Sequence, residues 1–220
     1  MAEPRPILAY EAKEDFEGHG GIVFARHAIV ARRRAADEYN DGEFHGITCK
    51  RAPWADQYAP GPVPALVMVE AGWWFECNGC TRRIDSDAED TEDEDREPIE
   101  PVEVGNQLWC SPACRKSDLA TRSARKIAEL AAIQRLRDLL WSKRPGVTFL
   151  GGDRAAAFSS DDGVEVRECS VWFTFPGATN SNGAEYKFTK ADDEPRIWMH
   201  PDDVQAWEAF RDRQNAEASP

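Results

Sequence analysis

Two cysteine pairs decide how this chain folds: Cys77-Asn-Gly-Cys80 and, after 29 intervening residues, Cys110-Ser-Pro-Ala-Cys114. A two-residue spacing lets both sulfurs of the first pair face one metal ion, and Gly79 permits the tight turn. Ser111-Pro112 predicts the N-cap and first turn of a helix, which places Cys114 where helix amides favour a thiolate. Four sulfurs complete a tetrahedral site with no open position, so the pattern predicts one structural zinc ion.

Other readings of the cysteines are two disulfides, a redox pair or unpaired core residues. Disulfides are rare in the reducing cytoplasm, and a thioredoxin-like motif needs a single pair in a strand-to-helix turn. The spacing of two matched pairs therefore favours a metal site. Cys49 and Cys169 have no partner by spacing, and we expect both to be small buried residues.

Composition and charge describe an acidic globular protein with a core. Of its 220 residues, 41% are hydrophobic and 30% are charged, and the net charge is −13. This length suits one large domain or two to three small ones. The first residues are acidic and lack the apolar run of a signal peptide, so we expect a cytoplasmic location. No stretch is long and apolar enough to predict a membrane span.

The charges are unevenly distributed along the sequence. Residues 85–103 hold eleven acidic residues and one arginine, whereas residues 115–144 hold nine basic and three acidic ones. The basic residues at the start of this second stretch are candidates for contacts to nucleic acid phosphates. Alternatively, they neutralise the acidic stretch or solvate a helix face. The candidates are Arg115, Lys116, Arg122, Arg125 and Lys126.

The order of patterns predicts an α+β protein: an N-terminal α/β unit, a four-cysteine zinc finger with a long helix, and a C-terminal antiparallel sheet plus helix. The expected segments are a small α/β unit (1–60), a linker and leading strand (61–71), the finger (72–125) with an acidic insert (85–103), a linking helix (126–144), a β meander plus helix (145–213) and a flexible tail (214–220). The insert is too poor in apolar residues to order itself, so we expect a solvated loop.

Local patterns predict the elements of the first and middle segments. Apolar runs at residues 7–10, 22–25 and 47–50 predict strands, and residues 27–39 predict a helix. After the finger, apolar residues at spacings near three and four predict one apolar side of a long helix that ends at residues 143–146. These apolar residues are Leu119, Ile127, Leu130, Ile133, Leu136 and Leu140.

The C-terminal segment reads as strands followed by a helix. Residues 147–150, 164–175 and 184–189 predict an antiparallel meander. The apolar residues of the middle strand change phase, so we expect a bulge near residues 168–169. A last helix begins at Pro201 and is predicted to bury Val204, Trp207 and Phe210.

Two resemblances rest on particular strings. Leu108-Trp-Cys-Ser-Pro-Ala-Cys-Arg-Lys-Ser-Asp-Leu119 resembles the second half of treble-clef zinc fingers, such as the small zinc-binding DNA gyrase inhibitor proteins, whose finger lacks so long and acidic an insert. The strings Lys50-Arg-Ala-Pro-Trp-Ala-Asp-Gln-Tyr58, Gly72-Trp-Trp-Phe-Glu-Cys-Asn-Gly-Cys80 and Cys114-Arg-Lys-Ser-Asp-Leu-Ala120 are similar to a group of uncharacterised bacteriophage and prophage proteins. This second resemblance implies a phage gene and zinc binding, and brings no activity with it.

The functional expectation is an interaction protein of phage origin, not an enzyme, that binds nucleic acid or a host protein through the finger region. The alternative is an acidic inhibitor of a host protein, such as a DNA-binding one. A third reading is an enzyme that uses His19, His27 and His45, although these histidines show no metal-ligand spacing. No Walker motif, dinucleotide fingerprint or Ser/His/Asp arrangement is present, and no small-molecule substrate is indicated.

Overall fold

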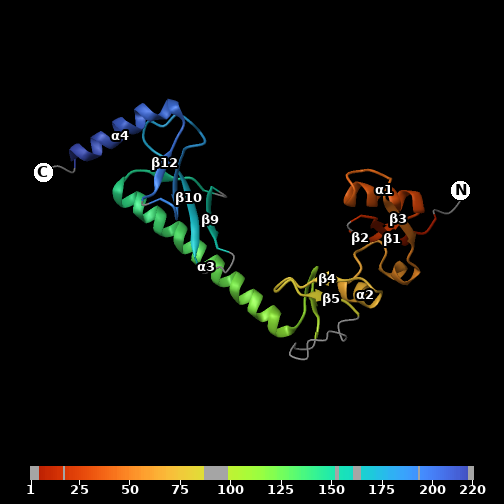
Figure 1. Ribbon diagram of the computed structural model, residues 1–220. Helices are drawn as coiled ribbons and strands as arrows, with labels where there is room; N and C mark the ends of the chain where they lie inside the picture. The colour runs from red at the N-terminus through yellow and green to blue at the C-terminus, as the bar shows by residue number, and fades with distance from the viewer. Residues whose placement is uncertain are drawn as a thin grey trace. The chain divides into compact units, whose positions relative to one another are not determined.

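The computed structural model describes residues 5–16, 18–86, 99–151, 154–160, 165–192 and 194–217 (Figure 1). The fold is α+β, as the sequence predicts, and combines helices with antiparallel sheets. The chain divides into two compact units, residues 1–115 and 116–220. None of the described helices combines the length and the apolar character needed to cross a membrane.

An antiparallel three-stranded sheet opens the first unit. The strand order is β2-β1-β3, with bounds Gly20–Ala25, Leu8–Glu14 and Ile47–Arg51. Helix α1, Ala28–Tyr39, packs on this sheet through three buried alanines at helical spacing, Ala31, Ala35 and Ala36. The strands and the helix predicted within residues 7–50 are confirmed.

A 3-10 turn, η1 (Pro53–Tyr58), follows the sheet and is fastened to it by Asp56. The Asp56 carboxylate accepts hydrogen bonds from the Ala9 N–H (2.7 Å) and from two nitrogens of the Arg51 guanidinium (2.6 and 3.0 Å). The bidentate bond from Arg51 lowers the pKa of Asp56. The turn is therefore part of the first unit's structure.

Helix α2, Ala65–Glu70, lies where the sequence predicts a linker and a leading strand. That expectation was wrong because a short apolar run fits a strand and a helix equally well. A distant residue stabilises the helix: the Glu103 carboxylate accepts hydrogen bonds from the N–H groups of Ala65 (2.7 Å) and Leu66 (3.1 Å). Val69 is buried in the core of the finger and secures the other end of α2.

The acidic insert, residues 85–103, lies in large part outside the described residues, which stop at 86 and resume at 99. Its described end belongs to the finger. Ile99 packs against the finger core, and the Glu100 N–H donates to the Cys110 carbonyl (2.9 Å). Val102–Val104 forms strand β6. The expectation of a solvated loop therefore stays a prediction for residues 87–98 alone.

The second unit holds a five-stranded antiparallel sheet. The order is β12-β11-β10-β8, and β9 also pairs with β10. The bounds are Thr148–Phe149 (β8), Ala155–Ser159 (β9), Val166–Thr174 (β10), Ala184–Thr189 (β11) and Arg196–Trp198 (β12). A register shift between Val166 and Glu168 marks a bulge beside the place where the sequence predicts one.

Two helices complete the core of the second unit. Helix α3, Pro112–Lys143, contributes Leu136 and Leu140, and helix α4, Val204–Glu217, contributes Trp207 and Phe210. The ring of Trp207 meets Phe173 edge-on, with centroids 5.7 Å apart. Residues 214–217 of the predicted tail are helical, and the predicted boundary at 125/126 falls inside the continuous α3.

Several apolar residues on the predicted apolar sides of α3 and α4 are exposed. In α3, Leu119 is 39%, Ile127 68% and Leu130 53% exposed, whereas Leu136 and Leu140 are buried. Val204 of α4 is 41% exposed. Periodicity predicts which residues share a face, but it does not say where along a helix the packing partner ends.

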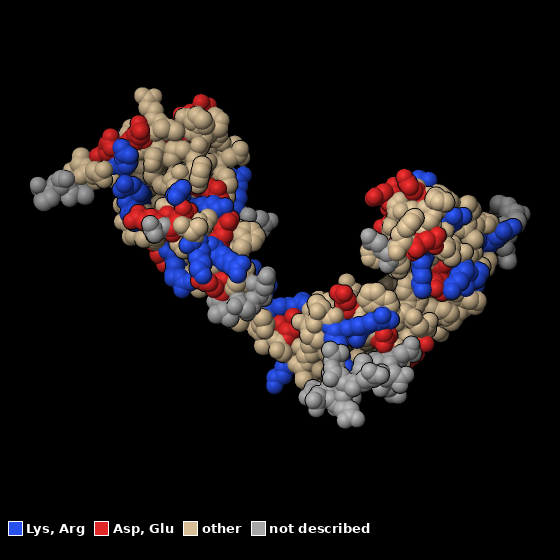
Figure 2. Space-filling view, in the orientation of Figure 1, with Lys and Arg blue, Asp and Glu red and all other residues tan. Residues whose placement is uncertain are grey.

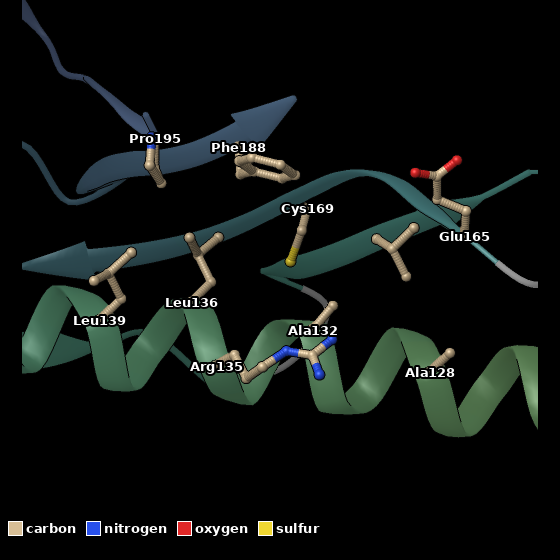
Figure 3. Close-up of a pocket in the computed structure, with 10 residues that line it drawn as sticks. Ala128, Ala132, Arg135, Leu136, Leu139, Glu165, Cys169, Phe188 and Pro195 are labelled. Carbon is tan, nitrogen blue, oxygen red and sulfur yellow. The ribbon is translucent and has the colours of Figure 1, made fainter. Parts of the chain in front are cut away.

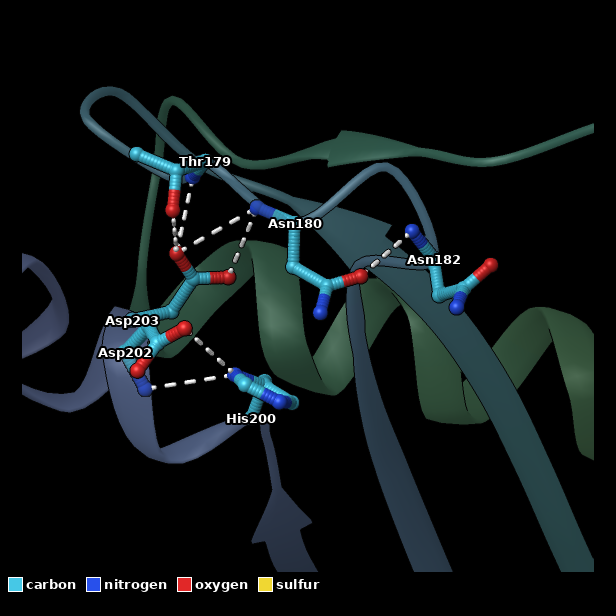
Figure 4. A network of polar contacts seen from close by, with 6 residues as sticks. All are labelled: Thr179, Asn180, Asn182, His200, Asp202 and Asp203. Carbon is cyan, nitrogen blue, oxygen red and sulfur yellow. Dashed lines mark hydrogen bonds and ion pairs between the residues drawn. The ribbon is translucent and has the colours of Figure 1, made fainter.

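Asp203 is a buried carboxylate that joins η3, Pro201–Asp203, to the loop between β10 and β11 (Figure 4). Its oxygens accept hydrogen bonds from the Thr179 N–H (2.7 Å), the Thr179 hydroxyl (2.8 Å) and the Asn180 N–H (3.2 Å). The hydrogen bond from the Thr179 N–H contributes most to lowering the pKa of Asp203. The neighbouring Asp202 instead contacts His200 (3.3 Å) at the surface.

Asp203→Asn is expected to lower the Tm of the second unit by several degrees at pH 7, because an amide cannot accept all of these bonds. A lowered folded-state pKa stabilises the fold above the pKa of the unfolded chain, and this contribution is lost as the pH falls through the folded-state pKa. The Tm gap to the wild type should therefore narrow as the pH drops below about 4. Asp202→Asn is the control, and an equal loss in both variants would contradict the assignment.

Candidate metal centre

The first cysteine pair sits in a turn between two short paired strands, β4 (Phe75–Glu76) and β5 (Arg83–Ile84). The Cys77 N–H donates to the Arg82 carbonyl (2.8 Å), and the Thr81 N–H donates to the Cys77 carbonyl (2.9 Å). Thr81 adopts a left-handed conformation, with φ 59°. These backbone bonds hold the two sulfurs of the pair on one side of the turn.

The second pair joins a hairpin to a helix. Strands β6 and β7 (Gln107–Trp109) pair around a turn at Gly105, and Cys110 directly follows β7. The Ser111 hydroxyl accepts a hydrogen bond from the Cys114 N–H (3.1 Å) at the start of α3, as expected of an N-cap. A turn with the first cysteine pair, a hairpin and a helix that carries Cys114 thus follow one another along the chain.

The four sulfur atoms converge. The Sγ atoms of Cys77 and Cys114 are 3.5 Å apart, those of Cys80 and Cys110 are 3.6 Å apart, and all four lie within 4.8 Å of one another. A tetrahedron with metal–sulfur bonds of about 2.3 Å has edges of about 3.8 Å. All six cysteines of the chain are free, and both separations far exceed the roughly 2.05 Å of a disulfide. The cluster can therefore hold a metal ion.

The two halves of the site are tied together by Asn78, which lies between the first two cysteines. Its side-chain oxygen accepts a hydrogen bond from the Leu108 N–H (2.7 Å), and its own N–H donates to the Leu108 carbonyl (2.8 Å). Leu108, Trp109 and Ile84 are buried beneath the site. The sequence does not predict this role of Asn78. The one indication is that a short polar residue lies between the two cysteines.

Hydrogen bonds to sulfur prepare one cysteine for ionisation. Burial opposes the Cys77 thiolate, but N–H groups of Cys110 (3.3 Å) and Gly79 (3.4 Å) point at its sulfur, and the pKa of Cys77 falls to about 6. Burial and the neighbouring sulfurs raise the pKa of Cys110 to about 11, and the pKa of Cys114 is raised in the same way. The site thus favours one thiolate, and a bound cation would be needed to stabilise further thiolates.

Metal binding should weaken steeply as the pH falls. Cys110 and Cys114 must each release a proton when they ligate, so the apparent affinity for Zn²⁺ is expected to drop at least about 100-fold per pH unit below pH 8. Competition with a chromophoric chelator at pH 6, 7 and 8 measures this, with the chelator's own pH dependence recorded separately. An affinity that does not vary over that range would contradict ligation by these thiols.

The five basic residues proposed from the sequence lie at the start of α3. The Arg115 guanidinium lies over the Trp109 ring, 5.5 Å from its centroid, and Arg122 pairs with Asp118 (2.8 Å). Lys116 and Lys126 are exposed, whereas Arg125 is half-buried. The structure thus gathers these residues on one helix, and Arg115 and Arg122 make the contacts just described within the chain.

The N-terminal histidines do not form a metal-binding group. In the described part of the chain, the four cysteines are the one cluster of three or more His, Cys, Asp or Glu side chains placed to hold a metal. His19 lines a polar hollow with Glu14, and the His27 ring lies 3.4 Å from an Arg5 nitrogen. A catalytic use of these histidines stays a prediction from the sequence.

Comparison with protein-family models, with curated proteins and with solved structures finds no match for this chain. The resemblances to phage proteins and to gyrase inhibitors therefore stay predictions. What can be said of function rests on the residues themselves.

Proposed function

We propose that the chain is a zinc-stabilised interaction protein in which Cys77, Cys80, Cys110 and Cys114 hold one structural zinc ion. Four thiolates at tetrahedral spacing are a soft ligand set that suits zinc. Four protein ligands leave no position for water or substrate, so we assign the metal a structural role. The phage origin implied by the sequence is part of this proposal and rests on the resemblance.

We further propose that the start of α3 binds nucleic acid, and one face of this helix supports the idea. Residues 115, 119, 122, 126 and 130 follow one another at spacings of three and four, so they share a face. They are Arg115, Leu119, Arg122, Lys126 and Leu130, and the last four are exposed. Lys and Arg side chains line much of α3 in Figure 2, with acidic ones between them. The Arg122 side chain pairs with Asp118 but is 44% exposed, so its guanidinium is also open to a phosphate.

Replacing residues 87–98 by a short Gly/Ser linker tests this proposal. The change removes a net charge of −7 and leaves Ile99 and Glu100, which contact the finger, in place. We expect stronger binding to a 20-nucleotide single strand and to a 20-base-pair duplex, measured by fluorescence anisotropy at about 50 mM salt. The gain should fade by about 200 mM salt, because counterion release drives such contacts.

The triple variant Arg122→Ala/Arg125→Ala/Lys126→Ala, made in the shortened protein, should bind the same strands at least about tenfold more weakly, with a shallower salt dependence. None of the three is a metal ligand, so zinc content should not change. Arg167→Ala/Arg211→Ala/Arg213→Ala removes equal charge elsewhere and is the matched control. Equal losses in both triple variants, or no binding by the shortened protein at about 50 mM salt, would end the nucleic-acid proposal.

A host protein is the second candidate partner, and the exposed apolar residues of α3 favour it. Leu119, Ile127 and Leu130 lie on the same half of the helix as the basic residues, and exposed apolar patches commonly mark protein-binding surfaces. A pull-down from bacterial lysate with nuclease treatment separates the two candidates. A partner retained after nuclease, and lost in Ile127→Ser/Leu130→Ser, would favour the protein.

A further inference from the structure

The second unit contains a cavity of about 420 Å³ between α3 and the sheet (Figure 3). Its walls are mostly apolar and come from three elements. Leu136 and Leu139 line it from the helix, Val166 from β10, and Phe188 from β11. The sulfur of Cys169 points from β10 towards α3 and forms part of the floor (Figure 3). Cavities of this size and character suit small ligands with an apolar body.

One cation at the cavity has no counter-charge in the described chain. Arg135 lines the cavity from α3 and is exposed, and among the described residues no carboxylate lies within 4.0 Å of its guanidinium. The acidic residue of the lining, Glu165, is already paired with Lys190, with 2.6 Å between its oxygen and the lysine nitrogen. In Figure 3 the Glu165 carboxylate points away from α3. The cavity therefore joins apolar walls to one available positive charge.

The floor of the cavity carries no charge that would repel an anion. Cys169 is 2% exposed, and its burial raises the pKa of the thiol to about 11 although Arg135 and Arg137 act in the opposite direction. The group is thus a neutral thiol at pH 7 and adds to the apolar surface.

We propose that this cavity binds an amphipathic monocarboxylate with an alkyl chain. The alkyl chain lies among Leu136, Leu139 and Phe188, and the carboxylate accepts hydrogen bonds from Arg135. The walls supply apolar burial, and the arginine supplies a charge-assisted bond that a neutral molecule cannot make. This binding site goes beyond the proposed metal and nucleic-acid functions and does not depend on them.

Calorimetric titration of the full-length, zinc-loaded protein with decanoate, octanoate and octan-1-ol tests the site. Each buried methylene changes affinity about fourfold, so octanoate should bind about 15-fold more weakly than decanoate. Arg135→Gln should weaken octanoate binding about tenfold and leave octan-1-ol unchanged. The control, Lys143→Gln, removes a positive charge from α3 at a position outside the cavity lining. It should change the affinity for neither octanoate nor octan-1-ol.

A second test of the proposal fills the cavity with a larger side chain. Ala132→Phe places a ring among the lining residues and should abolish binding of all three compounds. If that variant does not melt cooperatively, Ala128→Leu fills the other end of the lining and replaces it. Octanoate should also shift the methyl NMR signals of Leu136, Leu139 and Val166 in the wild type. The proposal is overturned if octanoate does not bind, if Arg135→Gln binds it as tightly as the wild type, or if a folded, filled variant still binds.

Discussion

Cys77→Ser is expected to remove the metal and unfold the finger, and Cys114→Ser should do the same. The finger core is small, and its halves meet around the four sulfurs. In zinc-finger peptides the metal contributes about 10–16 kcal/mol, most of which is folding free energy. Zinc should therefore fall from one equivalent per chain to near zero, as measured by elemental analysis. Loss of the Cys77 sulfur also removes the acceptor of the Cys110 and Gly79 N–H groups.

Limited proteolysis reports the folding side of this prediction, since new cleavage sites should open within residues 72–114. Cys49→Ser is the matched control because Cys49 lies outside the cluster and should keep both zinc and protease resistance. Wild-type protein prepared without chelator that carries less than half an equivalent of zinc would disprove the zinc assignment. Full zinc and unchanged proteolysis in both variants would show that the metal sits elsewhere.

The two cysteine pairs could be predicted because short-range geometry determines each of them. A two-residue spacing fixes the first pair within one turn, and Ser111-Pro112 fixes the second at the start of a helix. Tertiary contacts bring the two pairs together, namely the hydrogen bonds between Asn78 and Leu108. No local pattern encodes such a contact across thirty residues. The spacing therefore indicated a site, but it did not indicate how the site is held.

The errors in the fold share a cause. Residues 65–69 form a short apolar run, and one stabilising contact of the helix comes from Glu103, nearly forty residues away. The apolar side of α3 is continuous in sequence, yet burial begins near Ile133 and leaves Leu119 and Ile127 exposed. Local sequence gives the period of an element reliably. It does not give the partner against which the element packs, and both errors concern the partner.

Phe173→Ala is expected to destabilise the second unit by about 3–5 kcal/mol, the usual cost of removing a fully buried ring. Phe173 has no exposed surface, and its ring touches Trp207 and Phe175, with centroids 5.7 and 6.3 Å away. The cavity left behind would open at the meeting point of the sheet and α4, which cannot close without moving Trp207. Urea unfolding followed by tryptophan fluorescence measures the loss.

Phe158→Ala is the matched control, because the same ring is removed at a position 59% exposed, where substitutions change stability by about 0.5 kcal/mol or less. Zinc content should stay at one equivalent in both variants, since every candidate ligand lies within residues 77–114 of the other compact unit. A loss below about 1 kcal/mol for Phe173→Ala would contradict the central place of this ring. Loss of zinc together with the urea transition would instead mean that the two units unfold as one.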